Sequence, residues 1–141
     1  MARGPKAKQQ VAFRVQPGTL AHLKRRVSET GLSQTELAER YLEEGLRLDE
    51  YPLIAFRDGA AGRRPGLIGS RLDVWQLVET VRQNSSVEEA AAYLELPVEK
   101  VQAAMRYYAD YTDEIDDWIS RANALAEREQ ASWRRQQDLV G

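Results

Sequence analysis

The chain has 141 residues, no cysteine and a formal net charge of −2 that hides a strong asymmetry. Residues 1–28 hold seven Lys/Arg and no Asp or Glu, which leaves 13 basic and 22 acidic side chains for the rest of the chain. The lack of cysteine excludes a disulfide framework and thiol chemistry. No apolar stretch has the length of a membrane span, and no apolar segment typical of a signal peptide is visible. We therefore expect a cytoplasmic protein without a membrane partner, whose basic end binds nucleic acid.

The basic N-terminal segment alternates polar and apolar residues. We expect residues 1–8 to form a flexible arm and residues 9–16 to form a strand. One face of this strand carries Val11, Phe13 and Val15, and the other carries polar or small side chains. A lone strand cannot pair or bury itself, so the pattern predicts a homodimer in which two strands form a ribbon. An edge strand in an ordinary α+β domain is the alternative.

Two short amphipathic helices are predicted after the strand. Pro17-Gly18-Thr19 is typical of a turn, with Thr19 as the N-cap of a helix that ends near Gly31. Ser33-Gln34-Thr35-Glu36 is a capping box that begins a second helix, and Pro52 ends that helix. The apolar stripe of the second helix is wider than a lone helix on a strand can cover. We expect a dimer core of Val11, Phe13, Val15, Leu37, Tyr41 and Leu42.

The order strand, helix, helix over residues 10–48, with the turn Gly31-Leu32-Ser33-Gln34-Thr35, resembles the ribbon-helix-helix superfamily of the MetJ, Arc and CopG type. The resemblance implies a ribbon that enters the major groove of double-stranded DNA. Outward-facing Gln can bind adenine and Arg can bind guanine in a bidentate manner, whereas Ala offers only a methyl contact. The expected base contacts are Gln10, Ala12 and Arg14. The expected phosphate contacts are Lys6, Lys8, Lys24, Arg25, Arg26, Ser33, Gln34 and Thr35.

The second half begins at a predicted domain boundary near Pro52. We expect a short hairpin from strands at 53–56 and 67–68, joined by a loop at 58–66. Helical periodicity returns at Asp73 and stops at Asn84-Ser85-Ser86. A second capping box, Ser86-Val87-Glu88-Glu89, begins a helix at 87–95, and residues 97–109 complete a pair with the length and turn of a helix-turn-helix. The predicted fold is mainly α, with an arm at 1–8, a ribbon-helix-helix domain at 9–50, a small domain at 51–112 and a C-terminal amphipathic helix at 113–141.

Residues 51–120 are similar to the domain-of-unknown-function family 433. The similarity lies in Tyr51-Pro52-Leu53-Ile54, the turn Gly69-Ser70-Arg71-Leu72 and the stretch Ala103-Ala104-Met105-Arg106-Tyr107-Tyr108. Ser70 and Leu72 stand where the family usually has Thr and Ile, and the loop at 58–66 departs from its short form. The resemblance implies a VapB-type antitoxin of a type II toxin–antitoxin pair, encoded beside a PIN-like ribonuclease toxin.

The second half of the chain offers weaker signals of nucleic-acid or partner binding. The second helix of the predicted pair has few base-reading side chains and acidic surroundings, which favours packing or protein contact over a second DNA site. Four arginines lie in the predicted turns. They could contact phosphate, contact an acidic toxin surface or simply be solvated: Arg57, Arg63, Arg64 and Arg71.

The C-terminal helix is the predicted toxin-binding element. Trp118 is expected to help close its own domain, whereas Trp133 lies beyond any expected core. An exposed aromatic residue flanked by arginines is typical of an interface anchor, and an amphipathic tail can lie in a partner's groove. The arginines could neutralise an acidic ribonuclease site. A frayed or dimer-packing helix is the alternative. The expected toxin contacts are Trp118, Leu125, Arg128, Trp133, Arg134 and Arg135.

No residue pattern is typical of an enzyme. His22 is the single histidine, and the chain has no phosphate-binding glycine loop. A carboxylate cluster at 110–117 crowds the start of the last helix, where negative charge favours the helix dipole. We expect no catalytic residue, no metal and no cofactor. The sequence thus predicts an antitoxin that binds its operator as a homodimer, represses its own transcription and neutralises a PIN-like toxin. A stand-alone dimeric regulator and a non-DNA-binding adaptor are the alternatives.

Overall fold

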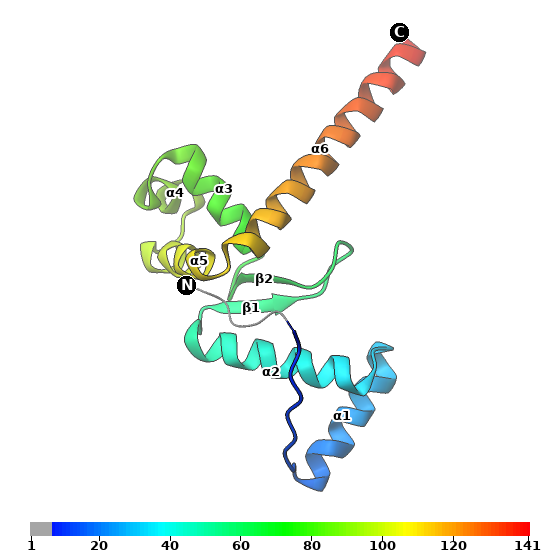
Figure 1. Ribbon diagram of the computed structural model, residues 1–141. Coiled ribbons are helices and arrows are strands. Elements are labelled where there is room, and N and C mark those ends of the chain that lie inside the picture. The colour runs from blue at the N-terminus through cyan, green and yellow to red at the C-terminus, as the bar shows by residue number, and fades with distance from the viewer. Residues whose placement is uncertain (1–6) are drawn as a thin grey trace. The chain divides into compact units, whose positions relative to one another are not determined.

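The computed structural model describes residues 7–141 and divides the chain into two compact units, Met1–Glu50 and Tyr51–Gly141. Six helices and one two-stranded antiparallel sheet occur in the described residues (Figure 1). The prediction of a mainly helical chain with a short hairpin and a long C-terminal helix is confirmed. Lys6 and most of the predicted arm lie outside the described residues. Across residues 7–141, none of the helices combines the length and the apolar character that a bilayer crossing requires.

The first unit contains two helices, α1 (Pro17–Thr30) and α2 (Gln34–Glu50). Helix α1 begins two residues before the predicted N-cap Thr19, because the fixed φ of Pro17 suits the first helical turn. Gly31 ends α1 in the left-handed conformation (φ 74°), and its N–H donates to the Val27 carbonyl at 3.1 Å. Ser33 Oγ accepts the Glu36 N–H at 3.1 Å, which is the predicted cap of α2. The Glu36 carboxylate accepts from the Ser33 hydroxyl rather than from its backbone N–H.

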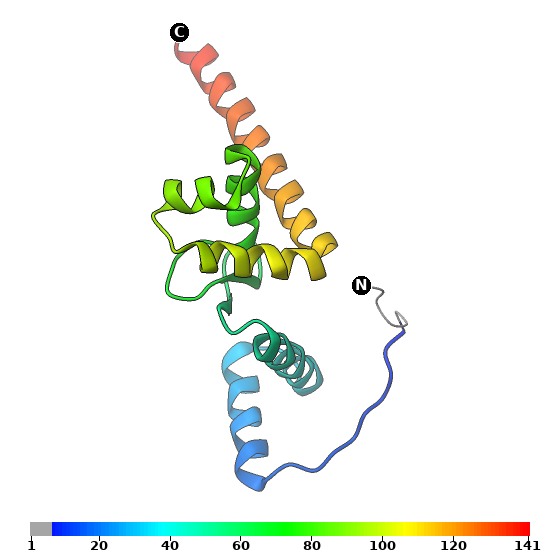
Figure 2. The ribbon, with the colours of Figure 1, turned by 90° about the vertical axis from the view of Figure 1, so that its left-hand side faces the viewer.

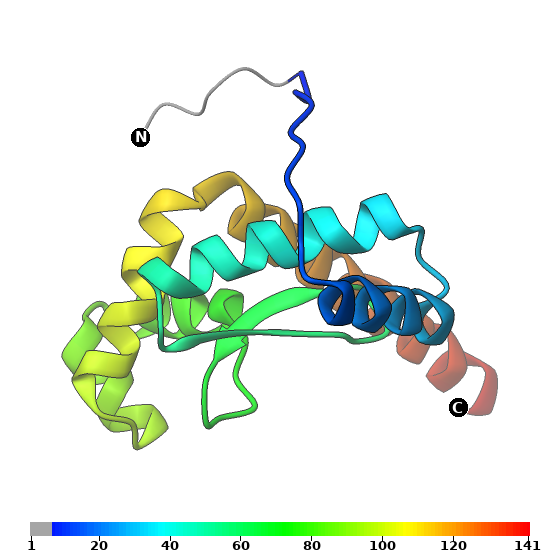
Figure 3. The ribbon, with the colours of Figure 1, turned by 90° about the horizontal axis from the view of Figure 1, so that it is seen from below.

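The predicted strand at 9–16 is absent from the described chain. Residues 8–16 run as an elongated segment into α1 and pair with no other segment (Figure 3). A strand needs a neighbour for its N–H and C=O groups, and a single chain offers none at this position. The ribbon-helix-helix arrangement is therefore not formed by one copy of the chain, although both of its helices are present.

The second unit begins with an antiparallel hairpin of β1 (Ile54–Arg57) and β2 (Arg64–Leu67). Strand β2 begins three residues before the predicted strand at 67–68, so the loop is shorter than expected. The predicted loop at 58–66 includes Pro65 and Gly66, but in the structure both residues belong to β2. Pro65 lies opposite Phe56 in the sheet. The Ile68 N–H donates to the Leu53 carbonyl at 2.8 Å, which makes the Phe56–Pro65 pair a non-hydrogen-bonded one. The missing N–H of proline thus removes no bond to β1.

Four helices follow the hairpin, and their predicted positions are confirmed to within a few residues. They are α3 (Val74–Asn84), α4 (Val87–Leu94), α5 (Val98–Asp110) and α6 (Thr112–Val140). The predicted cap of α4 is present, because Ser86 Oγ accepts the Glu89 N–H at 3.0 Å. Pro97 is the N-cap of α5 rather than its first residue. Helix α3 contacts α4, α5 and α6, and so forms the centre of this unit (Figure 2).

The core of the second unit extends into the first turns of α6. Ile115, Trp118 and Ile119 are buried together with the apolar side of α3 and α5. The Tyr107 ring lies 5.3 Å from that of Tyr51, edge to face, and 4.6 Å from that of Tyr111. The first turns of the helix that was predicted at 113–141 therefore belong to this core. Trp118 closes its own domain as expected.

The Ser33 cap gives a local test of the first unit. We expect Ser33→Ala to destabilise the protein by about 1 kcal/mol, because the Glu36 N–H loses its acceptor, whereas Ser33→Asp keeps an acceptor and most of the stability. Urea denaturation followed by circular dichroism measures the change. Ser28→Ala is the control: Ser28 Oγ donates only to the Lys24 carbonyl within α1, so its removal should be neutral or slightly stabilising. Equal losses for both variants would contradict the assigned cap.

Candidate functional site

The first unit leaves a large apolar surface uncovered. The side chain of Phe13 is 68% exposed and that of Leu46 is 60% exposed, with Tyr41 and Leu42 also exposed. A groove of about 680 Å³ is lined by residues of the 8–16 segment, α1 and α2. A second groove of about 610 Å³ lies between the start of that segment and the first half of α2. We define the open apolar surface as Val11, Phe13, Val15, Ala38, Tyr41, Leu42 and Leu46.

Five of the six predicted dimer-core residues belong to this open apolar surface. Leu37 is the exception: it is 1% exposed and already buried within one chain, so it supports the packing of the unit itself. An exposed surface of several large apolar side chains is unusual in a monomer and is typical of a protein-contact site. The surface is thus a candidate interface for a second protein chain.

The predicted base-contact residues alternate with the apolar ones along the elongated segment. Gln10, Ala12 and Arg14 are exposed, as are their neighbours Val11 and Phe13. Among the described residues, Arg14 has no ion pair or hydrogen bond that would hold it. The single chain therefore leaves these three side chains accessible, and only pairing of the segment would separate a polar face from an apolar one.

The predicted phosphate-contact residues differ in whether they already have a bonding partner within the chain. Lys8 Nζ forms an ion pair with Glu39 at 3.0 Å. Arg26 forms an ion pair with Glu29 and donates a hydrogen bond to Tyr41 Oη at 3.3 Å. The hydrogen bond to Tyr41 is the main cause of a raised pKa of Arg26, and the contact with Glu29 acts in the same direction. Lys24 and Arg25 are exposed and have no such partner in the described chain. The start of α2 presents Gln34 and Thr35 to solvent, while Ser33 Oγ is engaged as the cap.

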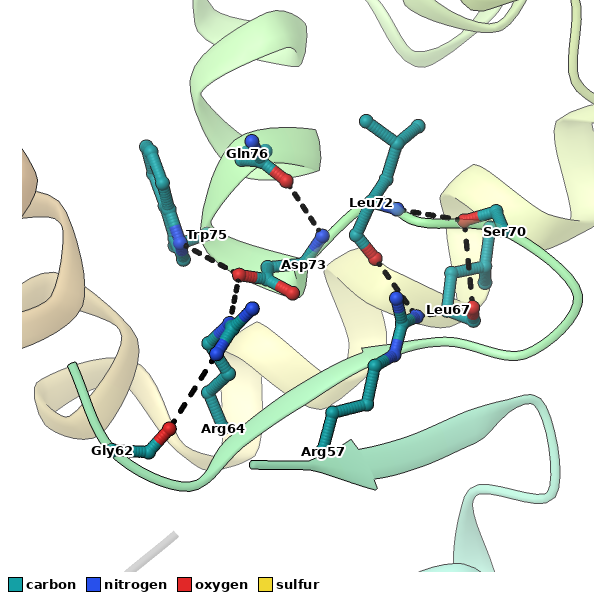
Figure 4. A network of polar contacts seen from close by, with 9 residues as sticks. All are labelled: Arg57, Gly62, Arg64, Leu67, Ser70, Leu72, Asp73, Trp75 and Gln76. Carbon is teal, nitrogen blue, oxygen red and sulfur yellow. Dashed lines mark hydrogen bonds and ion pairs between the residues drawn. The ribbon is translucent and has the colours of Figure 1, made fainter. Parts of the chain in front are cut away.

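A polar network joins the hairpin of the second unit to the start of α3 (Figure 4). Asp73 is buried, and its Oδ2 accepts from Arg64 Nε at 2.5 Å and from Trp75 Nε1 at 3.3 Å. The Asp73 N–H donates to Gln76 Oε1 at 2.8 Å, which caps the helix. Asp73 Oδ1 is buried and has no hydrogen-bond partner in the described part of the chain. The network holds β2 against α3 through one carboxylate.

Arg57, the last residue of β1, bonds to two backbone carbonyl groups, one at the end of β2 and one before α3. Its Nη2 donates to the Leu67 carbonyl at 2.7 Å and to the Leu72 carbonyl at 3.3 Å (Figure 4). The guanidinium lies directly over Gly66, where any Cβ would collide with it. A larger residue at this position would displace the Arg57 guanidinium from its two carbonyl acceptors.

Two of the four turn arginines take none of the three roles that the sequence left open, which were phosphate contact, contact with a toxin and solvation. Arg57 and Arg64 bond within the fold, as described above. Arg63 pairs with Asp58 at 3.2 Å, and Arg71 alone of the four is exposed. A guanidinium forms strong charge-assisted hydrogen bonds with carboxylate and carbonyl oxygens, but the sequence pattern does not show which oxygens the fold brings near it.

The carboxylates around the start of α6 are used locally. Tyr108 Oη donates to Asp116 at 2.7 Å and accepts from Arg82 at 2.6 Å, while Tyr107 Oη donates to Glu114 at 3.4 Å. Burial is the main cause of a raised pKa of Tyr108, and the hydrogen bond to Asp116 acts in the same direction. Within residues 7–141, no group of three or more His, Cys, Asp or Glu side chains is arranged to hold a metal ion.

The predicted toxin-contact residues divide between the core and the surface. Trp118 is 7% exposed and cannot contact a partner, because it packs in the core of its own unit and lies beneath Arg121, whose guanidinium carbon is 3.9 Å from the ring centroid. The other five residues follow the last buried residue of α6, Ile119, in the part of the helix that extends beyond helices α3 to α5 (Figure 1). All five are exposed: Leu125, Arg128, Trp133, Arg134 and Arg135.

The second unit is the part of the chain that matches a known family. Residues 54–108 match the family described as protein of unknown function (DUF433), so the predicted resemblance is confirmed for the hairpin, α3, α4 and most of α5. The match includes neither the first unit nor α6, and it lends no support to the ribbon-helix-helix resemblance. No curated protein and no solved structure matches the chain.

Three residues of the candidate surfaces and of the polar network are not among the site residues that the sequence predicts. Leu46 and Ala38 extend the open apolar surface along α2, and the width of the apolar stripe on this helix was the signal that could have included them. Asp73 was expected only to begin a helix. Its role in joining Arg64, Trp75 and α3 depends on a contact across the hairpin, which local sequence does not specify.

The Asp73 network can be tested through its cation. We expect Arg64→Met to lower the free energy of unfolding by about 3 kcal/mol, because it leaves the buried Asp73 carboxylate without its charge partner. Chemical denaturation measures the loss. Arg71→Met is the matched control in the same turn and should change stability by less than about 0.5 kcal/mol, since Arg71 is exposed. If the two variants are equally stable, the network is not what holds the hairpin.

Proposed function

We propose that the protein is the antitoxin of a type II toxin–antitoxin pair, which binds operator DNA as a homodimer through its first unit and binds a PIN-like ribonuclease toxin through the C-terminal half of α6. The observation that carries the proposal is the open apolar surface beside an unpaired basic segment. One chain leaves Phe13 and Leu42 exposed and residues 8–16 without a strand partner. A second copy of the chain supplies both missing elements.

Dimerisation follows from the burial of this surface. Antiparallel pairing of two 9–16 segments satisfies their backbone groups and places Val11, Phe13 and Val15 of each copy over the helices. Each large apolar side chain that becomes buried contributes about 1.5–3 kcal/mol. The polar face of the ribbon then carries Gln10 and Arg14 from both chains.

DNA binding follows from the polar face and the free cations. A two-stranded ribbon fits the major groove, where Arg14 can reach guanine and Gln10 can reach adenine. Lys24 and Arg25 are exposed and unpaired among the described residues, so they are free to bind phosphates. The antitoxin part of the proposal rests on the resemblance of the second unit and on the exposed aromatic and basic residues of α6.

The dimer interface predicts a residue-specific change of oligomeric state. We expect Phe13→Glu to convert a dimer to a monomer in sedimentation equilibrium at micromolar concentration, because it puts a charge in the buried face of the ribbon. Ala12→Glu introduces the same charge one residue away, on the opposite face, and should leave the dimer intact. A wild-type monomer at this concentration would contradict the proposed dimer.

Two variants separate base reading from phosphate attraction. With DNA from the region upstream of the protein's own gene, we expect Arg14→Ala to lose about 1–3 kcal/mol of discrimination against unrelated DNA. Lys24→Ala should weaken binding to both DNAs equally and reduce the salt dependence of the affinity. Titrations at two or more salt concentrations measure both effects. Unchanged specificity in Arg14→Ala would remove the ribbon as the reading element.

The antitoxin role predicts a complex with the product of the adjacent gene. We expect the two proteins to co-purify when they are expressed together, and the full-length chain to suppress the growth defect caused by the partner alone. A variant that ends at Ser120 keeps the core of the second unit, which reaches Ile119. It should lose suppression while it still binds DNA. Full suppression by the shortened variant would exclude α6 as the toxin-binding element.

A further inference from the structure

The apolar face that closes the second unit continues along the exposed half of α6. Residues seven apart in a helix lie almost above one another, with a drift of about 20°. The buried residues Trp118 and Ile119 are thus followed on the same face by Leu125, Ala126, Trp133, Leu139 and Val140. Leu125 is 48% exposed and Trp133 is 59% exposed. We call this surface the α6 stripe; its centre line also holds Ala122, Glu129 and Gln136.

The two edges of the α6 stripe differ in charge. Arginines recur every seven residues along one edge, at Arg121, Arg128 and Arg135. The other edge repeats neutral side chains, at Asn123, Gln130 and Gln137. Arg121 is held by Asp117 at 3.0 Å, whereas Arg128 and Arg135 have no ion pair within the described residues. The charge of the stripe is therefore one-sided, and its last two arginines are free to pair with another molecule.

A second copy of α6 is a poor occupant of this stripe. A parallel pair of helices would bring Glu129 of each copy together, because residues on the centre line of the contact meet their own equivalents. An antiparallel pair would place the arginine row of one copy beside that of the other. Both symmetric arrangements thus oppose like charges, which are destabilising at such distances.

We propose that the α6 stripe binds an apolar groove of a different protein whose rim is acidic on one side only, so that the arginine row fixes the direction in which the helix lies. This inference rests on the proposed function, because it defines the toxin surface that the helix recognises. Seven residues rise about 10 Å along a helix, so the acidic groups that face Arg128 and Arg135 are about 10 Å apart. Trp133 fills the groove between them, and the opposite rim is neutral.

The polar residues within the stripe are compatible with a buried contact. Gln136 Nε2 donates to Ser132 Oγ at 3.2 Å, so this pair meets part of its hydrogen-bonding need inside the helix. Glu129 on the centre line requires a donor from the partner. A nucleic acid would suit the arginine row, but its grooves are lined by polar base edges and phosphates and cannot cover Leu125 and Trp133 with apolar surface, so a protein is the better occupant.

The test compares neighbouring arginines on different sides of one helix. The full-length chain is titrated by calorimetry with the purified product of the adjacent gene. Arg128→Gln and Arg135→Gln should each weaken binding about tenfold, and Trp133→Ala about 30-fold. Arg134→Gln is the matched control: Arg134 adjoins Arg135 in sequence but lies on the far side of the helix, and its loss should change the affinity less than twofold. Added salt should weaken the wild type and Arg134→Gln more than Arg135→Gln.

The outcomes separate this inference from the proposed function. Equal losses in Arg134→Gln and Arg135→Gln, or no loss in either, would overturn the one-sided rim while the complex itself supports the antitoxin role. No binding of the wild-type chain would overturn both. Binding of α6 to DNA or to vesicles of anionic phospholipid that requires Arg128 and Arg135 would also overturn the inference, because the acidic partner would then not be a protein groove.

Discussion

The burial of apolar surface is the constraint on which the rest of this structure depends. The second unit meets it alone: α3 lies against three helices, and Trp118 and Tyr107 complete a closed core. The first unit does not, because two helices and one elongated segment have too few elements to cover Phe13, Tyr41 and Leu42. The same is true of α6 after Ile119. The chain thus has one closed core and two apolar surfaces that a single copy leaves exposed.

Polar groups inside the second unit join its hairpin to its helices. Arg64 and Trp75 both donate to one oxygen of Asp73, and Arg57 donates to two backbone carbonyls of the same turn. These contacts join a two-stranded hairpin, which has little stability by itself, to the helix that follows it. These contacts account for Arg57 and Arg64, and the position of the Arg57 guanidinium over residue 66 favours glycine there. Arg57 and Arg64 are thus engaged in bonds within the fold.

The proposed functions lie in the parts of the chain outside this core. In the proposal, the 8–16 segment reads bases, cations such as Lys24 and Arg25 bind phosphates, and the exposed part of α6 binds the partner. None of these regions lies within residues 54–108, which match the family of unknown function. The matched domain provides a stable centre, and the first unit and α6 supply the surfaces. The α6 stripe is continuous with the core, so a partner that binds it extends a packed face that already exists.

Local sequence determined most of the secondary structure, because caps and turns are short-range features. Ser33 and Ser86 cap helices as predicted, Gly31 ends α1, and apolar periodicity located α3 to α6. The two candidate surfaces were also visible in the sequence, through the alternation at 9–16 and the tryptophan of the tail. Tertiary structure alone decided that Leu37 is buried within one chain, that Arg64 pairs with Asp73, and that residues 8–16 stay unpaired in one chain. Each of these outcomes depends on which distant groups come into contact, and residue spacing along the chain does not specify such contacts.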